Sequence, residues 1–242
     1  MPALQSTLAR PMLDPFQRGQ VEVVLVRPRN PLNIGAAARA MANFGFTRLT
    51  VVAPYAPHWR EARSAIGAPD LLQNAREAST LAEAVSSCTF VAGTATSVHR
   101  QPDQPVVPLP KLAPQLARKL DSRAQAALVF GPEKHGLTRD DLAYCHFLVE
   151  IPTEPSQPSM NLGQAVAVCL YELSRQADPS GPNLPAPPEQ PIPESGDPGP
   201  ATAPSGSLDL LAGVIEETMA ASGYSPPAMR AANRLDLRLA LR

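Results

Sequence analysis

The sequence predicts an α/β protein with a mainly parallel sheet covered by helices on both faces. Short, valine-rich apolar runs alternate with segments of helical spacing across residues 20–177. Such strands are apolar throughout because helices bury both faces of a parallel sheet. Apolar residues make up 44% of the 242 residues, enough for one sizeable core.

The predicted elements alternate along the chain. The runs rich in β-branched and apolar residues predict strands at Val21–Val26, Leu49–Val52, Thr89–Ala92, Ala126–Phe130 and Phe147–Ile151. Between and after them, apolar residues recur every three or four positions, which predicts helices at Asn33–Phe44, Ser79–Ser87, Lys111–Leu120, Thr138–Cys145 and Asn161–Arg175.

Proline divides the chain into three parts. Ten of the 29 prolines lie in residues 178–206, beside four glycines and no aromatic residue. Such a segment buries too little surface to offset its chain entropy, so we expect an extended linker. The predicted organisation is a domain at 20–177, the Pro-rich linker at 178–206, and a helical C-terminal extension at 207–242. Within the extension, the spacing predicts helices at 208–221 and 228–242.

Several classes of protein are disfavoured. No stretch approaches the ~18 consecutive apolar residues of a membrane helix, and the first twenty residues lack the apolar region of a secretory signal. Three cysteines without a CxxC pair and four histidines without ligand spacing argue against a metal site and against a disulfide scaffold. We therefore expect reduced thiols, a cytoplasmic location, no membrane and no metal.

The net charge of −1 conceals an uneven distribution. Residues 1–63 contain eight arginines and three acidic residues. Arginine has forked donors suited to phosphate, although a GC-rich genome would produce the same preference for arginine.

The first candidate site is Asn33-Ile-Gly-Ala-Ala-Ala-Arg39. Asn33 is expected to cap the helix that follows. The predicted buried stripe is Ile34, Ala38, Met41 and Ala42, and a second stripe is formed by Gly35, Arg39 and Asn43. The small residues around Arg39 permit another backbone to approach closely, which favours a functional arginine over a solvated one.

The second candidate site follows the predicted strand that ends at Phe130. Its residues, Gly131-Pro-Glu133-Lys-His-Gly-Leu-Thr, superficially match a phosphate loop, but Leu137 occupies the position of the required lysine. No GxGxxG is present either. A glycine just beyond the carboxyl end of a strand is still a usual ligand position in α/β sheets, and the alternative is a plain strand-to-helix turn.

The third candidate site is the loop from Ile151 to Asn161, which contains three prolines and opens a helix. Either Ser159 or Asn161 could cap that helix. Capping explains the presence of one of these two residues. It does not explain why the loop before the helix is polar and made rigid by three prolines.

In order, NxGxxxR, VFGxExxGL and SxNL resemble the motifs of the SpoU family of RNA 2′-O-ribose methyltransferases, within the SPOUT superfamily. The resemblance covers roughly residues 20–175. The ARAMANFGF segment and the Gly93–Thr96 turn are similar to the TrmJ branch, whose members methylate tRNA and carry a helical C-terminal extension. The chain differs from the family pattern at Met160, where leucine is usual, at Pro158 before Ser159, and in its long linker.

The resemblance implies a C-terminal trefoil knot, a homodimer, and S-adenosyl-L-methionine as cofactor. The cofactor residues it implies are Thr94, Ala95, Thr96, Gly131, Ile151, Pro158, Ser159 and Met160. The implied catalytic set is Arg39 with Asn33, Glu133, Ser159 and Asn161. A guanidinium with a pKa above ~12 is a poor base, so Arg39 is expected to bind RNA phosphate and stabilise developing alkoxide charge.

The C-terminal extension adds a further candidate surface. Arg230, Arg234, Arg238 and Arg242 recur every fourth residue, which places them along one helix face. We expect Ala231, Leu235 and Leu239 to dock on helix 208–221, with the arginines directed outward. Arg230, Arg234 and Arg238 are then RNA-binding candidates, and the alternative is a solvated amphipathic helix.

The sequence therefore predicts an S-adenosyl-L-methionine-dependent ribose 2′-O-methyltransferase that acts on tRNA. rRNA is the alternative substrate. A non-catalytic RNA-binding protein that retains the cofactor pocket, and a small-molecule enzyme with coincidental motifs, are the alternative functions.

Overall fold

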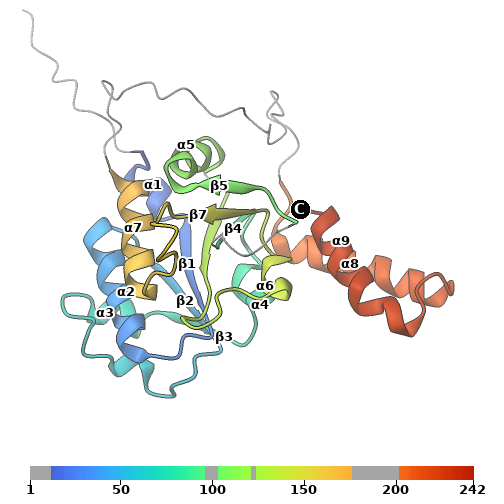
Figure 1. Cartoon of the computed structure of the whole chain (residues 1–242), viewed down its shortest axis with the longest axis horizontal. Coiled ribbons are helices and arrows are strands. Elements are labelled where there is room, and N and C mark those ends of the chain that lie inside the picture. Colours follow the sequence, from blue (N-terminus) through green and yellow to red (C-terminus); the bar gives the residue numbers. More distant parts are fainter. Residues whose placement is uncertain (1–11, 96–102, 121–123, 176–201) are drawn as a thin grey trace, which may run out of the picture.

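A seven-stranded parallel sheet forms the centre of the protein (Figure 1). The computed structural model describes residues 12–95, 103–120, 124–175 and 202–242. In the sheet order β3-β2-β1-β6-β4-β7-β5, the strands are β1 (Val21–Val26), β2 (Arg48–Val52), β3 (Arg76–Ala78), β4 (Phe90–Thr94), β5 (Val106–Pro108), β6 (Ala126–Phe130) and β7 (Phe147–Glu150). The predicted α/β class with a parallel sheet is confirmed, and the trefoil knot stays a prediction. The sequence analysis missed β3 and β5, which are three-residue strands at the two edges.

Helices cover both faces of the sheet. One face packs against α2 (Pro31–Phe44), α3 (Pro69–Gln73), α5 (Leu109–Lys119) and α7 (Leu162–Ser174), and the other against α4 (Leu81–Val85) and α6 (Arg139–Leu142). Along β1, Val23 and Leu25 enter the first core, whereas Val24 and Val26 enter the second. Alternate side chains thus serve two cores, which explains why the strands are apolar throughout. The short α1 (Pro15–Arg18) lies beside α5, where the Gln17 side chain donates to the Ala117 carbonyl.

The centre of the sheet contains a switch point. Strands β1 and β6 are parallel neighbours, with Val21 opposite Ala126 and Leu25 opposite Phe130. After β1 the chain turns to the face of α2, and after β6 it turns to the face of α6. The two loops leave adjacent carboxyl ends toward opposite faces, and a switch point of this kind is the usual ligand position in such sheets.

The start of α2 differs from the prediction. Asn30, not Asn33, is the N-cap, and its side chain accepts a hydrogen bond of 3.0 Å from the Leu32 N–H. Pro31 then occupies the first helical turn, where its missing N–H costs nothing. Asn33 is therefore free to turn its side chain toward other partners. Within the predicted buried stripe, Ala42 is exposed.

The small residues of α2 allow close packing within the chain. A Cβ at Gly35 would lie 2.9 Å from the Ala65 backbone nitrogen. On α7, a Cβ at Gly163 would lie 2.7 Å from the Ala36 Cβ. The expected close approach is thus made by the protein's own chain, and Arg39, one turn beyond Gly35, is exposed.

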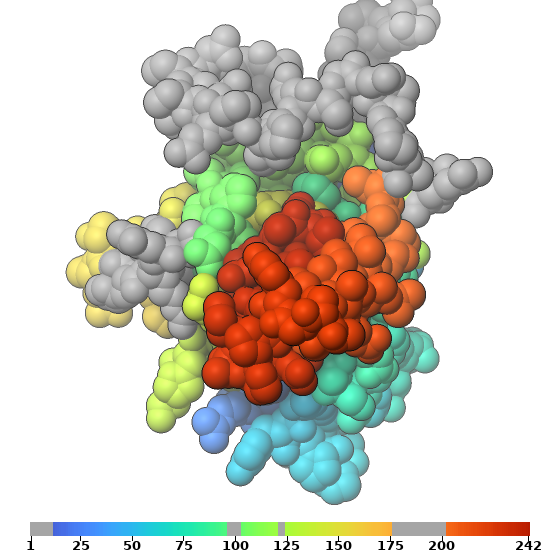
Figure 2. All heavy atoms as spheres, turned by 90° about the vertical axis from the view of Figure 1, so that its right-hand side faces the viewer, coloured from blue at the N-terminus to red at the C-terminus, as the bar shows by residue number. Residues whose placement is uncertain are grey.

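The C-terminal extension is a helical hairpin that projects from the side of the body (Figures 1 and 2). It contains α8 (Ser205–Ala221), the short 3-10 helix η2 (Pro227–Met229) and α9 (Arg230–Ala240). The Ser205 N–H donates to the Cys88 carbonyl at 2.8 Å, which anchors the first turn of α8. Helix α8 begins at Ser205 and so includes the last two residues of the predicted linker, most of which lies outside the described residues.

The expected outward stripe of arginines is wrong in its C-terminal half, because Arg238 and Arg242 turn inward, whereas Arg234 stays more than half exposed. Arg234 donates to both Glu216 carboxylate oxygens, at 2.7 and 2.8 Å, and Arg242 donates to Asp209 at 3.0 Å. Arg238 lies 3.5 Å from Asp209, and its guanidinium lies over the Tyr144 ring. Asp209 and Glu216 are seven residues apart and so share one face of α8, which attracts the arginines inward. The side chain of Arg242 is only 1% exposed, whereas Arg230 is exposed.

No helix among the described residues has the length and apolar character that a membrane crossing requires.

Gly131→Ala should destabilise the protein. An added Cβ would lie 2.3 Å from the Leu137 nitrogen and 2.4 Å from the Gly136 carbonyl carbon, both backbone atoms that cannot easily move. Overpacking of this kind costs about 1–3 kcal/mol, measurable by urea unfolding. Gly213→Ala is the matched control, because nothing lies within 4 Å of its Cβ position inside α8, and it should leave stability unchanged or slightly higher. Equal midpoints for the two variants would contradict the packing argument.

Candidate active site

The three sequence motifs meet through one chain of side-chain hydrogen bonds. Asn33, in the first turn of α2, donates from Nδ2 to Glu133 Oε1 at 2.8 Å. Asn161, at the start of α7, donates from Nδ2 to Asn33 Oδ1 at 3.0 Å. We call this arrangement the Glu133–Asn33–Asn161 chain. It lies beside the β1/β6 switch point, since Glu133 follows β6 and Asn33 follows β1.

Glu133 organises the loop after β1. Its carboxylate also accepts hydrogen bonds from the backbone N–H groups of Arg29 (3.2 Å) and Asn30 (3.3 Å). Partial burial raises the pKa of Glu133, but the hydrogen bonds from Asn33 and the backbone outweigh it, and the pKa is lowered. The carboxylate is therefore ionised at neutral pH and is occupied as an acceptor, a state suited to holding a loop in place.

Asn161 has two roles. Its Oδ1 accepts hydrogen bonds from the N–H groups of Gly163 (2.9 Å) and Gln164 (3.4 Å), and so caps α7. Its Nδ2 simultaneously orients Asn33. Of the two capping candidates, Asn161 is thus the cap, and Ser159 is exposed in the preceding loop.

The residues implied for the cofactor lie along three neighbouring strand ends. Thr94 ends β4, Gly131 follows β6 and Ile151 follows β7, and these three strands are adjacent in the sheet. The Thr94 hydroxyl donates to the Val129 carbonyl at 3.1 Å, and the Ala95 N–H donates to the Val149 carbonyl at 3.1 Å. These bonds tie the loop after β4 to both neighbours. Pro158 and Met160 are half-buried in the loop before α7, and Thr96 lies outside the described residues.

Arg39 is not brought to the Glu133–Asn33–Asn161 chain. It follows Asn33 by six residues, so it points from a different side of α2. It is exposed, and among the described residues it forms no ion pair. Within one copy of the chain, the structure therefore joins three of the five predicted catalytic residues, and leaves Arg39 and Ser159 exposed.

An ion pair between a buried aspartate and a partly exposed arginine supports the same loop and was missed by the sequence analysis. Asp141 is 5% exposed and is bridged by the Arg27 guanidinium, with Nη1 at 3.1 Å from Oδ1. Burial raises the pKa of Asp141, but Arg27 and Thr138 lower it further than burial raises it. Thr138 and Asp141 form a capping box, a pattern that the sequence does display, whereas nothing in the sequence marks Arg27 as its partner.

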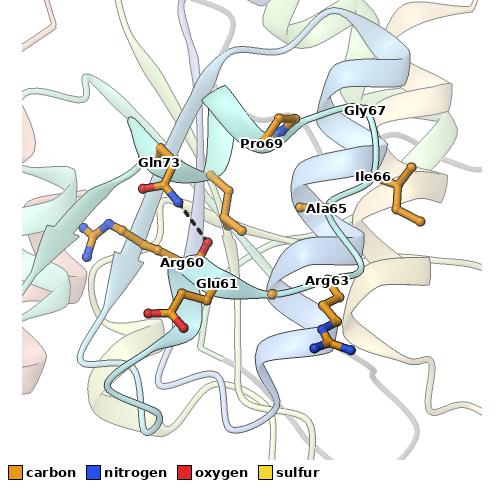
Figure 3. A pocket seen from close by; sticks show the side chains of 10 residues that line it. Arg60, Glu61, Arg63, Ala65, Ile66, Gly67, Pro69 and Gln73 are labelled. Carbon is orange, nitrogen blue, oxygen red and sulfur yellow. Dashed lines mark hydrogen bonds between the residues drawn. The ribbon is translucent and has the colours of Figure 1, made fainter.

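A separate hollow of about 310 Å³ lies between η1 (Trp59–Glu61), α3 and the loop that connects them (Figure 3). None of the three motifs lines it. The Arg60 side chain extends away from Ile66 and Gly67, lies over the Trp59 ring at 4.2 Å and pairs with Glu77 at 3.0 Å. These contacts stabilise the hollow's wall, and the candidate site remains at the sheet's switch point. The described residues also include no cluster of three or more potential metal ligands.

Comparison with known proteins agrees with this geometry. The profile of the SpoU rRNA Methylase family matches residues 20–171. The tRNA (cytidine/uridine/adenosine-2′-O-)-methyltransferase TrmJ of Pseudomonas aeruginosa (strain UCBPP-PA14) is 42% identical over 155 residues, which are 64% of this chain and 60% of that protein. The tRNA (cytidine-2′-O-)-methyltransferase TrmJ of Methanocaldococcus jannaschii is 39% identical over 155 residues, 63% of this chain and 66% of that protein.

Solved structures share this fold. The crystal structure of TrmJ from Z. mobilis ZM4 has a TM-score of 0.73 and 31% identity, and covers 91% of this chain and 89% of that one. A probable methyltransferase from Bordetella pertussis Tohama I has a TM-score of 0.60 and 30% identity, and covers 66% of this chain and 97% of that one.

The family profile covers more than half of the chain, and all three motifs lie within the residues that it matches. The chain belongs to the SpoU family. It spans about 60% of the length of the P. aeruginosa relative that it matches.

Glu133→Gln should destabilise the fold in a pH-dependent way. The folded-state pKa of Glu133 is lowered, so its ionised form contributes stability above the unfolded pKa of about 4.3. That contribution is lost as the pH falls through the folded pKa. The variant should lose about 1 kcal/mol at pH 7, the scale of a hydrogen bond, and the gap should close below about pH 4 in urea titrations.

The exposed Glu217→Gln serves as the control and should show no such pH-dependent gap. A gap for Glu133→Gln that stayed constant down to about pH 3 would mean that the carboxylate's charge is unimportant there.

Proposed function

We propose that the protein transfers a methyl group from S-adenosyl-L-methionine to a ribose 2′-hydroxyl of tRNA. The observation that carries this proposal is the Glu133–Asn33–Asn161 chain, which unites the three SpoU motifs at the sheet's switch point. The names of the TrmJ relatives support tRNA as the substrate class. A cytoplasmic location follows from that substrate and fits three buried, free cysteines.

The strand ends suit the proposed cofactor. Gly131 has no room for a side chain, because its Cβ would enter the Gly136–Leu137 backbone, so the loop after β6 folds back tightly at this strand end. Thr94, Ala95, Ile151 and Pro158–Met160 complete a cradle of backbone and small side chains that would hold the adenosine and methionine portions. S-Adenosyl-L-methionine supplies an electrophilic methyl group carried on a sulfonium.

The chain's own residues position the RNA and manage charge. Arg39 is exposed and unpaired by acids among the described residues, so its guanidinium is available for an RNA phosphate next to the target ribose. Asn33 and Asn161 fix the relation between α2 and α7, and Glu133 fixes the loop after β1. These contacts preorganise the site before RNA arrives, so little reorganisation accompanies the reaction.

The test is methyl transfer to unmodified tRNA transcripts and to rRNA, with the modified nucleotide mapped. Arg39→Ala should lower transfer to tRNA by roughly 10²-fold or more, the scale of removing one preorganised donor. Its melting temperature and its affinity for S-adenosyl-L-methionine should stay unchanged, because Arg39 is exposed. The exposed Arg118→Ala is the control.

Each other outcome identifies an alternative. Transfer to rRNA alone would change the substrate, and cofactor binding without transfer to any RNA would favour a non-catalytic RNA-binding protein. An Arg39→Ala variant that retained most of the activity would exclude Arg39 from the reaction.

We further propose that the protein is a homodimer. Leu32, Val168 and Tyr171 are large exposed apolar side chains along the paired helices α2 and α7, and the Tyr171 ring packs edge-on against Phe44 at 6.0 Å. In sedimentation, the full chain should have twice the monomer mass, and Tyr171→Glu should shift it toward monomer because it places a charge on this surface. Ile66→Glu, at an equally open position elsewhere, should remain dimeric. A wild-type monomer that is active would contradict the proposal.

The domain at 20–177 is proposed to carry the reaction, and the extension at 207–242 to add RNA affinity. Arg230 is exposed and has no ion pair among the described residues, whereas Arg234, although exposed, and Arg238 are engaged by acids of α8. Arg230→Ala should therefore reduce the slope of log affinity against log salt for tRNA by roughly 0.7–0.9, the effect of one phosphate contact. Deletion of 207–242 should flatten the slope further and leave cofactor affinity intact. An unchanged slope after deletion would rule out the extension as an RNA contact.

A further inference from the structure

We infer that Arg29 and Tyr55 form a stacking platform for the base of an RNA nucleotide that flanks the target ribose. The Tyr55 ring is 74% exposed, and the Arg29 guanidinium carbon lies 5.3 Å from its centroid. The inference rests on the proposed methyl transfer to RNA, and it assigns a recognition role to residues outside the three motifs.

The position of the pair links it to the candidate site. The backbone N–H of Arg29 donates to Glu133 Oε2 at 3.2 Å, so Arg29 borders the Glu133–Asn33–Asn161 chain directly. The Tyr55 N–H donates to the Pro28 carbonyl at 3.2 Å, which fastens the loop after β2 to the loop after β1. An RNA strand whose ribose reaches the site therefore passes close to the tyrosine ring.

The two loops are held in unusual conformations that bring the pair together. Arg27 has a φ of 45° and Ala53 a φ of 43°, a left-handed region that non-glycine residues rarely adopt. Both residues directly follow their strands, and each donates its N–H to a neighbouring strand end: Arg27 to Val52 and Ala53 to Ala78. The ion pair of Arg27 with the buried Asp141 fixes the first loop from the other side. Such conformations persist where the surroundings enforce them, and they concentrate at ligand sites.

The chemistry of the pair fits a nucleic-acid base. Aromatic rings and arginine planes are the groups on which unpaired RNA bases stack. The guanidinium covers one side of Tyr55, and the high exposure of the ring leaves its other side accessible. Arg29 also adds positive charge, since among the described residues its guanidinium forms no ion pair. A base would be bound here by stacking on its flat surface, whichever of the four bases it is.

The experiment measures tRNA binding and methyl transfer for variants of the full chain. Tyr55→Ala should weaken binding of unmodified tRNA transcripts by roughly ten- to a hundredfold, the scale of one base–aromatic stack, and leave S-adenosyl-L-methionine affinity unchanged. Tyr55→Phe should bind as the wild type does, whereas Tyr55→Leu, which is apolar but not aromatic, should bind as weakly as Tyr55→Ala. Ile66→Ala is the control at a comparably exposed apolar position, 68% exposed.

A modified substrate identifies the stacked base. Once the methylated nucleotide is mapped, transcripts with an abasic residue immediately before or after it are compared. The wild-type protein should bind one of these two transcripts more weakly than the intact transcript, by the same factor by which Tyr55→Ala weakens binding. The Tyr55→Ala variant should bind that abasic transcript and the intact transcript equally.

The outcomes separate this inference from the proposed function. Wild-type transfer with an unaffected Tyr55→Ala variant would overturn the platform alone, as would a Tyr55→Leu variant that binds normally. A loss of dimer mass in Tyr55→Ala would show that the surface contacts protein instead. If the wild type binds tRNA without transferring a methyl group, the proposed function fails, and the binding comparison still decides the platform. Absence of RNA binding would overturn both.

Discussion

The site depends on one constraint, the anchoring of the Glu133 carboxylate by three N–H donors. Two are backbone groups of the loop after β1, and the third is the side chain of Asn33, which Asn161 holds in turn. A carboxylate in this position joins the loop after β6 to the first turn of α2, and through Asn33 to the first turn of α7. Three segments that are distant in the sequence are thus fixed relative to one another by four hydrogen bonds.

The parallel sheet makes this arrangement possible. Adjacent strands end on the same edge, and the chain leaves β1 and β6 toward opposite faces, so the two strand ends form a switch point, where the Glu133 carboxylate joins the loops that follow. Close packing then holds the helices that border this switch point. Gly163 lets α7 approach Ala36 of α2, and Gly131 lets its loop fold back on Gly136. The ion pair of Arg27 with the buried Asp141 adds a further contact on the other face, so the loop after β1 is restrained from both sides.

The sequence predicted most of the fold because each long strand is strongly apolar and each long helix is amphipathic. It missed β3 and β5, since three residues at a sheet edge give no periodic signal. It placed the α2 cap at Asn33 because Asn30 and Asn33 are both good caps, and only the proline at position 31 distinguishes them. Because Asn30 caps the helix, the Asn33 side chain is available to bond Glu133 and Asn161.

The candidate site was predicted in part. The motifs identified Asn33, Glu133 and Asn161, but their hydrogen bonds cross about a hundred residues of sequence and cannot be read from spacing. In the extension, the regular arginines were recognised, whereas their partners Asp209 and Glu216 were not weighed. The Arg29–Tyr55 pair gave no signal, because it depends on two left-handed loop residues that no local pattern reveals.

A double-mutant cycle on Asn33→Ala and Asn161→Ala tests the account most directly. Both the free energy of unfolding and the rate of methyl transfer to tRNA would be measured for the two single variants and the double variant. Because Asn161 also caps α7, the cycle separates the Asn33–Asn161 bond from the cap. The account predicts a coupling of about 0.5–3 kcal/mol in both measurements, as for residues that share one network. Additive effects in both would contradict the claim that this chain holds the site together.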